Sequence, residues 1–464
     1  MTFDPTWAKA SEIAAAVSAG TVSAQSVIEQ TLARIKKVDK KLNAFTTVTD
    51  KRARETAKKI DQTRASGQQL GPLAGVPFAV KNLFDVAGIA TVAGSKINRR
   101  NPPAKQDSPL IERLEASGAI LVGALNMGEY AYDFTGENIH DGNSRNPHDL
   151  ERMTGGSSGG SGGAVAGGEV PLSLGSDTNG SIRVPSSLCG LFGLKPTYGR
   201  LPRHRSFPFV DSFDHLGPIA RSTHDLALAY DAMQGYDAGD AACQNRPVEP
   251  TLTHLDRGIG GIRVAVGGGY FQQAAFPKAL EALNKVAAAL EAAGEVEIPE
   301  AQRARSAAYV ITASEGASLH LDRLRKRAED FDPATRDRLI AGAMIPSAMV
   351  VKAQKFRRWY RDEVLKLFDH VDAILAPATP CTAPKIGQQT FKLGGVEMPV
   401  RANLGIYTQP ISFIGLPVVA VPVPLSPLPI AVQIICAPWR EDIALRIACE
   451  LEKTGVVSSP RPNI

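Results

Sequence analysis

The sequence has almost no surplus of one charge. Its 464 residues include 52 Lys and Arg against 47 Asp and Glu, a formal net charge of +5. Proteins that bind nucleic acid or anionic membrane surfaces carry far more positive charge over such a length, so we expect neither partner. Charged residues make up 21% of the chain and hydrophobic residues 44%. This composition excludes an intrinsically disordered protein.

Cysteine and targeting signals are also scarce. The five cysteines are odd in number, lie far apart and form no C-x-x-C pair. The sequence therefore predicts neither a disulfide framework nor a zinc site, and we expect no metal and no cofactor. Residues 1–7 lack a basic segment followed by an apolar one, which predicts no signal peptide and makes the cytoplasm the expected location.

Charge is absent altogether from one long stretch, residues 402–439. A membrane helix is one explanation for so long an uncharged segment. Seven prolines interrupt it, however, and prolines at that density forbid a continuous helix. The stretch therefore predicts short buried strands joined by turns.

What is present elsewhere is an alternation of strand and helix patterns. Residues 8–38 predict two helices, because Gly20 can end one and Thr21–Ser23 can cap the next. Apolar runs predict strands at 71–81, 119–123, 262–267 and 372–376, and periodic patterns predict helices at 107–117, 277–293 and 350–369. The alternation predicts an α/β fold with a large mixed, mainly parallel sheet and helices on both faces.

We expect one domain over residues 1–464. Its core would span about 71–225 and its C-terminal part 262–464, joined by a flexible surface connection at about 235–260, where Gly, Asp, Asn and Pro cluster. Basic residues concentrate between 303 and 361. Most of them are expected on a solvated helix face, with one or two left to face an anionic substrate.

Glycine is concentrated where the chemistry is expected. Residues 154–163 read TGGSSGGSGG, with six glycines in ten positions. A flexible linker, a phosphate-binding loop and a tight loop that positions serine hydroxyls all fit such a segment. No Lys follows the glycines as in a P-loop, and apolar segments flank them, so the tight loop is favoured.

The next segment, residues 175–185 (GSDTNGSIRVP), strengthens that hypothesis. It presents Ser181 on a constrained turn, where successive backbone N–H groups can stabilise an oxyanion; these belong to Thr178, Asn179, Gly180 and Ser181. Serine needs a base to act as a nucleophile. Neither segment contains a histidine that could serve as this base, so Lys81 is the other candidate base.

Together these motifs resemble the amidase signature family. The resemblance is carried by Lys81, by residues 155–161 and 175–185 and by GLKPT at 193–197, and it extends over nearly the whole chain. It implies a catalytic triad in which Lys81 is the base, Ser157 the bridging serine with a cis peptide bond, and Ser181 the nucleophile. It also implies that the protein is a hydrolase of linear amides.

Such a triad requires an uncharged lysine. An ordinary lysine has a pKa near ~10.4, so a neutral amine at pH 7 needs a downward shift of about three units, or about 4 kcal/mol. Burial in apolar surroundings lowers a lysine pKa in this way. The uncharged run Val76–Val80 that leads into Lys81 predicts such burial.

Three positions depart from the family pattern. Asn82 stands where the family often has Asp, Asn179 where it usually has Gly, and the segment 429–433 (PIAVQ) where P-x-G-x-Q is common. None of these positions belongs to the triad. Asn tolerates unusual backbone angles, so we expect Asn179 to be accepted and to shape the choice of substrate.

Residues 136–147, 177–187 and 199–204 resemble family members that release ammonia from a small anionic ureide. Those members work with a small companion subunit related to the small subunit of the tRNA-dependent amidotransferase, in a complex with two copies of each. An anionic substrate predicts an arginine clamp, for which we choose Arg338. The alternatives are a glutaminase subunit of glutamyl-tRNA(Gln) amidotransferase, another small-amide amidase, and a catalytically silent anion-binding scaffold.

Overall fold

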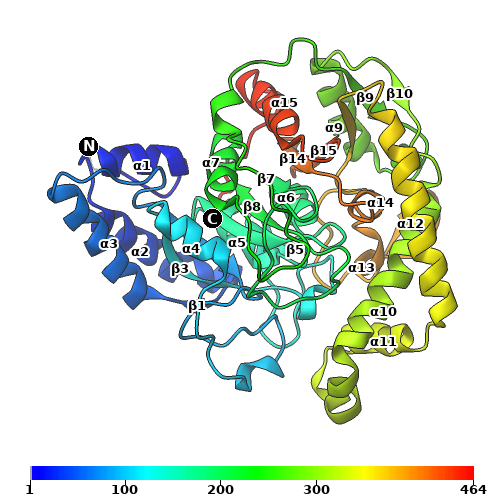
Figure 1. Ribbon diagram of the computed structural model, residues 1–464, viewed down its shortest axis with the longest axis horizontal. Coiled ribbons are helices and arrows are strands. Elements are labelled where there is room, and N and C mark those ends of the chain that lie inside the picture. The colour runs from blue at the N-terminus through cyan, green and yellow to red at the C-terminus, as the bar shows by residue number, and fades with distance from the viewer. Residues whose placement is uncertain (1–2) are drawn as a thin grey trace.

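One large sheet forms the centre of the molecule. The computed structural model describes residues 3–464, and eleven strands pair in the order β1-β3-β2-β6-β8-β7-β14-β15-β11-β9-β10. In Figure 1 the sheet extends from β1 at the lower left to β10 at the upper right. Its strands are β1 Phe45–Val48, β2 Pro77–Lys81, β3 Ile120–Leu125, β6 Leu172–Ser176, β7 Phe192–Lys195, β8 Leu216–Ala220, β9 Val264–Gly267, β10 Glu295–Val296, β11 Ala373–Pro377, β14 Val418–Val423 and β15 Ile430–Cys436. Two small ribbons lie outside it, β4 Arg145–Asn146 with β5 Asp149–Met153 and β12 Thr390–Leu393 with β13 Val396–Pro399.

The predicted large mixed sheet is confirmed, but the expectation that it is mainly parallel is not, because its parallel pairs are a minority and fall into two groups. Four of the ten pairings are parallel, in the groups β3-β2-β6 and β11-β9-β10, and six are antiparallel. Parallel neighbours need a crossover segment, which α4 supplies between β2 and β3 and α9 between β9 and β10. The short connection at 424–429 instead returns β15 antiparallel to β14.

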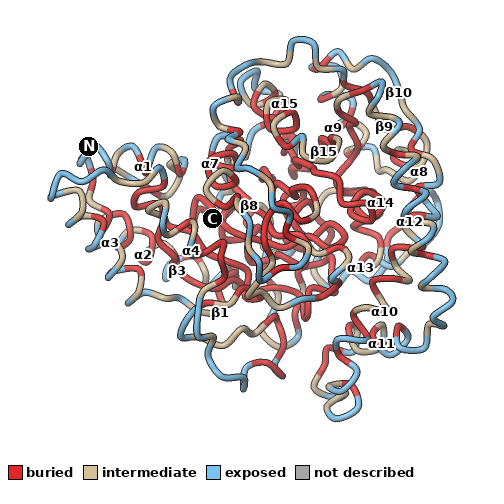
Figure 2. Tube along the Cα trace, in the orientation of Figure 1, coloured by how far each residue is buried: buried red, intermediate tan, exposed pale blue. Residues whose placement is uncertain are grey.

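Both faces of the sheet are covered. Every residue of the central strands β6, β8, β7, β14 and β15 is buried, whereas a sheet face in water gives alternating exposure. Figure 2 shows this buried interior ringed by helices with exposed outer sides. Helices α5 and α6 contact each other and the sheet, and α7 contacts α1, α4 and α15. Their bounds are α5 Gly159–Ala166, α6 Arg183–Cys189, α7 Thr223–Met233 and α15 Glu441–Lys453.

The predicted helices are present at nearly the predicted places. The two N-terminal helices are separated at Gly20, and Ser23 caps the second by accepting a bond from the Ser26 N–H at 3.0 Å. The structure gives α1 Ala10–Ser18, α2 Ala24–Leu42, α4 Pro109–Ala116, α9 Pro277–Ala289 and α12 Ser347–Leu367. Further helices are α3 Asp50–Ala65, α8 Tyr270–Gln273, α10 Ala301–Arg327, α11 Pro333–Ala343, α13 Val400–Asn403 and α14 Gln409–Ser412.

The charge-free stretch 402–439 contains the two buried strands β14 and β15, as predicted, but also the short helix α14. The turn Ser426–Pro427 between the strands has a cis peptide bond. No helix found in residues 3–464 is both long and apolar enough to cross a bilayer. The five cysteines are all buried and free.

Two segments lie outside the sheet core. Residues 235–260 form a connection whose one regular element is a short 3-10 turn at Leu252–His254. The flexibility expected of this connection stays a prediction. The division of the chain into a core and a C-terminal part also stays a prediction. Helices α10, α11 and α12, residues 301–367, pack on one another and form the right-hand side of Figure 1. We call them the helical arm.

Candidate active site

Lys81, Ser157 and Ser176 meet at one edge of the sheet. Strands β2 and β6 are parallel neighbours with Val80 opposite Leu174, so their carboxyl ends lie side by side and bring Lys81 next to Ser176. The Lys81 Nζ donates to Ser157 Oγ at 2.6 Å and to Ser176 Oγ at 2.9 Å. The predicted pairing of Lys81 with Ser157 is therefore present, and Ser176 is a third hydroxyl that the sequence did not single out.

The Lys81 amine lies in surroundings that favour its neutral form. The residue is fully buried, and burial lowers its pKa from 10.5 to about 7 although Asp214, Asp177 and Asp133 act in the opposite direction. A charged amine loses its hydration when it is buried, whereas a neutral amine loses much less. Burial thus accounts for the lowered Lys81 pKa that a Ser-Ser-Lys triad requires.

The segment before α5 is held by the loop at residues 133–136. The Gly156 N–H donates to Phe134 O at 2.8 Å, and the bond from Gly156 to Ser157 is cis, as the resemblance implies. A Cβ at Gly156 would lie 2.4 Å from Asp133 Oδ2. Glycine is needed here because two backbone segments pass too closely for a side chain, and this contact fixes the position of Ser157.

Loop 177–182 presents the backbone N–H groups of successive residues as hydrogen-bond donors. Within the described residues, no protein acceptor takes the N–H groups of Thr178, Asn179, Gly180 and Ser181. Gly180 has φ of +144°, and a Cβ there would meet Thr408 Oγ1 at 2.2 Å. The positive φ of this loop thus falls on Gly180 and not on Asn179. Free donors on a rigid loop are what stabilisation of an oxyanion requires.

A buried ion pair holds the base of this loop. Arg183 Nε donates to Asp177 Oδ2 at 2.9 Å, and both side chains are fully buried. The same carboxylate accepts the Ile182 N–H at 3.2 Å, and Arg183 also donates to Gln433 Oε1 at 2.8 Å. The pair ties the two ends of the loop together. It also gives Gln433, in one of the segments that departs from the family pattern, a structural role.

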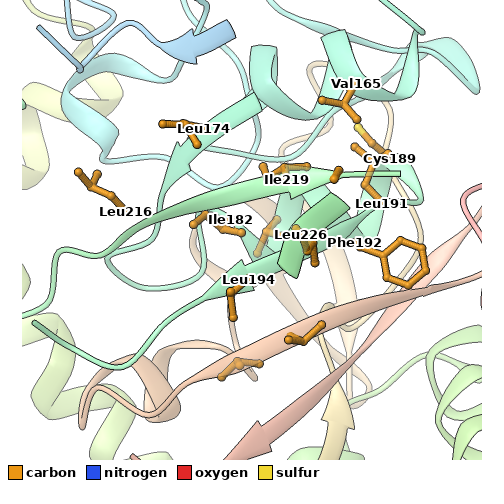
Figure 3. Packing of buried hydrophobic residues seen from close by; sticks show 14 of the residues in the cluster. Val165, Leu174, Ile182, Cys189, Leu191, Phe192, Leu194, Leu216, Ile219 and Leu226 are labelled. Carbon is orange, nitrogen blue, oxygen red and sulfur yellow. The ribbon is translucent and has the colours of Figure 1, made fainter. Parts of the chain in front are cut away.

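The side chain of Ile182 anchors the loop to the sheet, as Figure 3 shows among the packed strands. It lies over three glycines on the neighbouring strands β6, β7 and β8. Cβ atoms added at Gly175, Gly193 and Gly217 would lie 3.3, 2.9 and 3.1 Å from its carbons. These glycines leave the space that Ile182 fills, so the residue that follows Ser181 is fixed by packing.

Ser181 faces a narrow cavity with room for about one water molecule, 10 Å³. No hydrogen bond joins its Oγ to Ser157 within residues 3–464, so the structure brings together Lys81 and Ser157 but not the predicted Ser157–Ser181 contact. The predicted Arg338 lines the same cavity. Its guanidinium lies 3.5 Å from the centre of the Tyr132 ring and donates to Tyr132 O at 2.8 Å.

Several residues around this cavity carried no signal in the sequence. Tyr309 and Thr312 from α10 and Gln409 from α14 line it, and Thr312 accepts a bond from Asn179 Nδ2 at 3.0 Å. Their elements are more than 100 residues from Ser181 in the chain, and only the fold brings them close. A larger cavity of about 310 Å³ shares the lining residues Ala131, Thr178 and Phe209 with the cavity of Ser181.

The role of Asn82 proves to be structural. Its Oδ1 accepts the Gly94 N–H at 3.0 Å and its Nδ2 donates to Thr46 Oγ1 at 3.2 Å. These bonds fix the turn that follows β2. Within residues 3–464, no three His, Cys, Asp or Glu side chains gather as a metal-binding group.

Replacing Ser176 with alanine should change the pH dependence of turnover. An ammonium gains more from the Ser176 acceptor than a neutral amine does. Loss of that acceptor should therefore lower the Lys81 pKa further and move the acid limb of kcat/KM to lower pH, with about a tenfold loss of kcat. Ser176→Thr keeps a hydroxyl and should restore both values. Identical acid limbs in the wild type and Ser176→Ala would show that Ser176 does not position the amine.

Comparisons with known proteins agree with this site. A family model described as Amidase matches residues 26–445. AtzE of Pseudomonas sp. (strain ADP), a 1-carboxybiuret hydrolase subunit, is 53% identical over 97% of this chain and 99% of its own. The A subunit of glutamyl-tRNA(Gln) amidotransferase from Azotobacter vinelandii is 37% identical over 95% of this chain and 96% of its own.

Solved structures show the same similarity. One, described as a vestigial protein complex that reveals the evolutionary origins of an s-triazine catabolic enzyme, superimposes with a TM-score of 0.97 at 52% identity, over 98% of this chain and all of that one. A bacterial aryl acylamidase of the amidase signature family superimposes with a TM-score of 0.89 at 26% identity, over 96% of each chain.

Proposed function

Because this chain belongs to the amidase signature family of hydrolases, we propose that it releases ammonia from 1-carboxybiuret and gives urea-1,3-dicarboxylate. The observation that carries the chemistry is the buried Lys81 amine, 2.6 Å from Ser157 Oγ and with a pKa lowered to about 7. The similarity to the 1-carboxybiuret hydrolase protein AtzE, at 53% identity, supports the substrate.

The proposed reaction proceeds through an acyl-enzyme. Neutral Lys81 accepts a proton by way of Ser157 while Ser181 Oγ attacks the terminal carboxamide carbon. The free N–H groups of residues 178–181 stabilise the tetrahedral oxyanion, each worth about 3 kcal/mol in comparable hydrolases. Lys81 returns the proton through Ser157 to the leaving nitrogen, ammonia departs, and water hydrolyses the acyl-enzyme. The cavity must widen from 10 Å³ to admit the ureide, and in the proposed complex Ser181 Oγ comes within hydrogen-bond reach of Ser157.

Arg338 is the proposed clamp for the substrate carboxylate. It lines the cavity of Ser181, and its stacking on Tyr132 leaves the outer edge of the planar guanidinium available for a bidentate contact. Tyr132 thus fixes the plane in which the carboxylate would be bound.

Replacing Arg338 with lysine tests this assignment. Lysine keeps the charge but loses the bidentate geometry, so KM for an anionic ureide should rise about 10- to 100-fold. KM for a neutral amide such as biuret should change little, and kcat for both should stay within a few-fold. Steady-state ammonia release measures both constants. Equal rises of KM for the two substrates would remove Arg338 from the binding site.

We also propose that the protein is cytoplasmic, as expected from the sequence, and that it works with a small companion subunit. The description of a 52% identical structure as a protein complex supports a partner. The decisive experiment measures ammonia from 1-carboxybiuret, biuret, allophanate, glutamine and aryl amides, with and without a co-purified small subunit. Preference for 1-carboxybiuret supports the proposal.

A second candidate is the glutaminase component of a tRNA-dependent amidotransferase, favoured by the 37% identity to the Azotobacter vinelandii protein. In that case glutamine hydrolysis would require a large partner and tRNA. Ammonia release from glutamine that rises only when both are added would therefore reject the ureide as the substrate. It would support the glutaminase alternative.

A further inference from the structure

The helical arm carries most of the exposed apolar side chains of the described residues. Seven of the twelve exposed large hydrophobic residues lie between 319 and 359. Scattered apolar side chains are ordinary on a protein surface, whereas their concentration on three neighbouring helices indicates a binding surface. Among them, Val351 on α12 is 53% exposed and Met344 before α12 is 78% exposed.

The arm also carries the positive charge of the whole chain. Residues 301–367 contain 14 Lys and Arg against 8 Asp and Glu, an excess of six, while the full chain has a net charge of +5. The remainder is close to neutral. The charges of the whole chain nearly balance, but its excess of positive charge is concentrated on these three helices.

A groove of about 720 Å³ runs along α12 between this helix and the loops at 197–198, 414–415 and 438–439. Three exposed cations from α12 line it: Lys355, Arg358 and Arg361. None of them forms an ion pair within residues 3–464, since the ion pairs of the arm join other residues. They follow one another at three-residue intervals, about 4.5 Å along the helix axis.

The other basic residue at the groove, Arg357, is already engaged. Arg357 points inward, where its Nη2 donates to Ser212 O at 2.8 Å. The groove thus combines three cations and one carboxylate, Asp362, with the apolar residues Val350, Val351 and Ile414.

We propose that this groove is the docking surface for an acidic amphipathic helix of a second, different polypeptide. Carboxylates at i and i+3 or i+4 on such a helix are about 5 Å apart and match the cation spacing on α12, and its apolar side meets Val351 and Ile414. A groove that spans residues 350–362 accommodates about three helical turns, or about 18 Å.

Other occupants fit less well. A second copy of this chain would bring the same positive surface against itself, and like charges across an interface are costly. A small anion is held by converging donors, whereas these cations are spread over about 9 Å of helix. The proposal extends beyond the proposed reaction, since no groove residue takes part in it. The proposed companion subunit is one candidate partner, but the test does not depend on it.

The test measures binding of a labelled synthetic helix of about 20 residues, with leucine on one side and glutamate flanking it, by fluorescence anisotropy. Lys355→Glu/Arg358→Glu should weaken binding at least tenfold and leave amidase activity unchanged. The matched control, Arg325→Glu/Lys326→Glu, changes the net charge equally at exposed positions of α10 and should bind as the wild type does. A peptide with lysine for glutamate, and one of the same composition in scrambled order, should not bind.

Equal loss of binding in both double variants, or equal binding of the scrambled peptide, would show unspecific charge attraction and overturn the proposal. Sedimentation of the free enzyme provides an independent measurement. A dimer that dissociates in Lys355→Glu/Arg358→Glu but not in the control would show that a second copy occupies the groove, and would also overturn it.

Discussion

Ser181→Ala should abolish ammonia release, with a loss of kcat of about 10⁶-fold, as on removal of the nucleophile in comparable serine hydrolases. Ser181 is the serine on the loop whose backbone donors lack acceptors among residues 3–464. Without its oxygen no acyl-enzyme can form, although the oxyanion loop remains. Turnover of the purified enzyme on 1-carboxybiuret and on a simple amide measures the loss.

A serine-directed fluorophosphonate probe makes the result independent of the substrate. It should label the wild type at Ser181, as identified by peptide mapping, and leave Ser181→Ala unlabelled. Ser161→Ala is the matched control, because this buried serine donates to Leu174 O at 3.0 Å and faces no cavity of the site. It should keep its labelling and most of its activity. Turnover in Ser181→Ala within 100-fold of wild type would reject the nucleophile.

Lys81→Met should reduce kcat/KM by about 10⁴-fold, the upper range for general acid–base catalysis, and should remove its acid limb. The wild-type enzyme needs the neutral amine, and the Lys81 pKa is lowered to about 7. Its kcat/KM should therefore be constant at higher pH and fall tenfold per unit once the pH drops below about 7, as the ammonium forms. Methionine keeps the volume but cannot take a proton.

A second buried lysine provides the control for this experiment. Burial also lowers the pKa of Lys195 to about 7, but its Nζ donates to the carbonyl oxygens of Pro196 and Leu416, away from the serines. Lys195→Met should keep the acid limb at the wild-type position, whatever its effect on stability. If the limb persists in Lys81→Met, or disappears in Lys195→Met, Lys81 is not the base.

Part of the candidate site could be predicted from the sequence. The motifs around Ser157 and Ser181 have fixed spacing within one chain segment, so the resemblance identified them. Ser176 lies within the second motif but was not singled out, because its contact with Lys81 depends on the parallel register of β2 and β6. Asn82 drew attention as a departure from the family pattern, and its hydrogen bonds explain it as a structural residue.

The sequence alone determined the family, the reaction class and most of the elements, because local periodicity, turn residues and short motifs record them directly. Only the tertiary structure decided the order of the strands, the mixture of parallel and antiparallel pairs and the walls of the cavity around Ser181. These features depend on contacts between residues far apart in the chain, such as Asn179 with Thr312. The burial that lowers the pKa of Lys81 has the same origin, since many distant segments together exclude water from one amine.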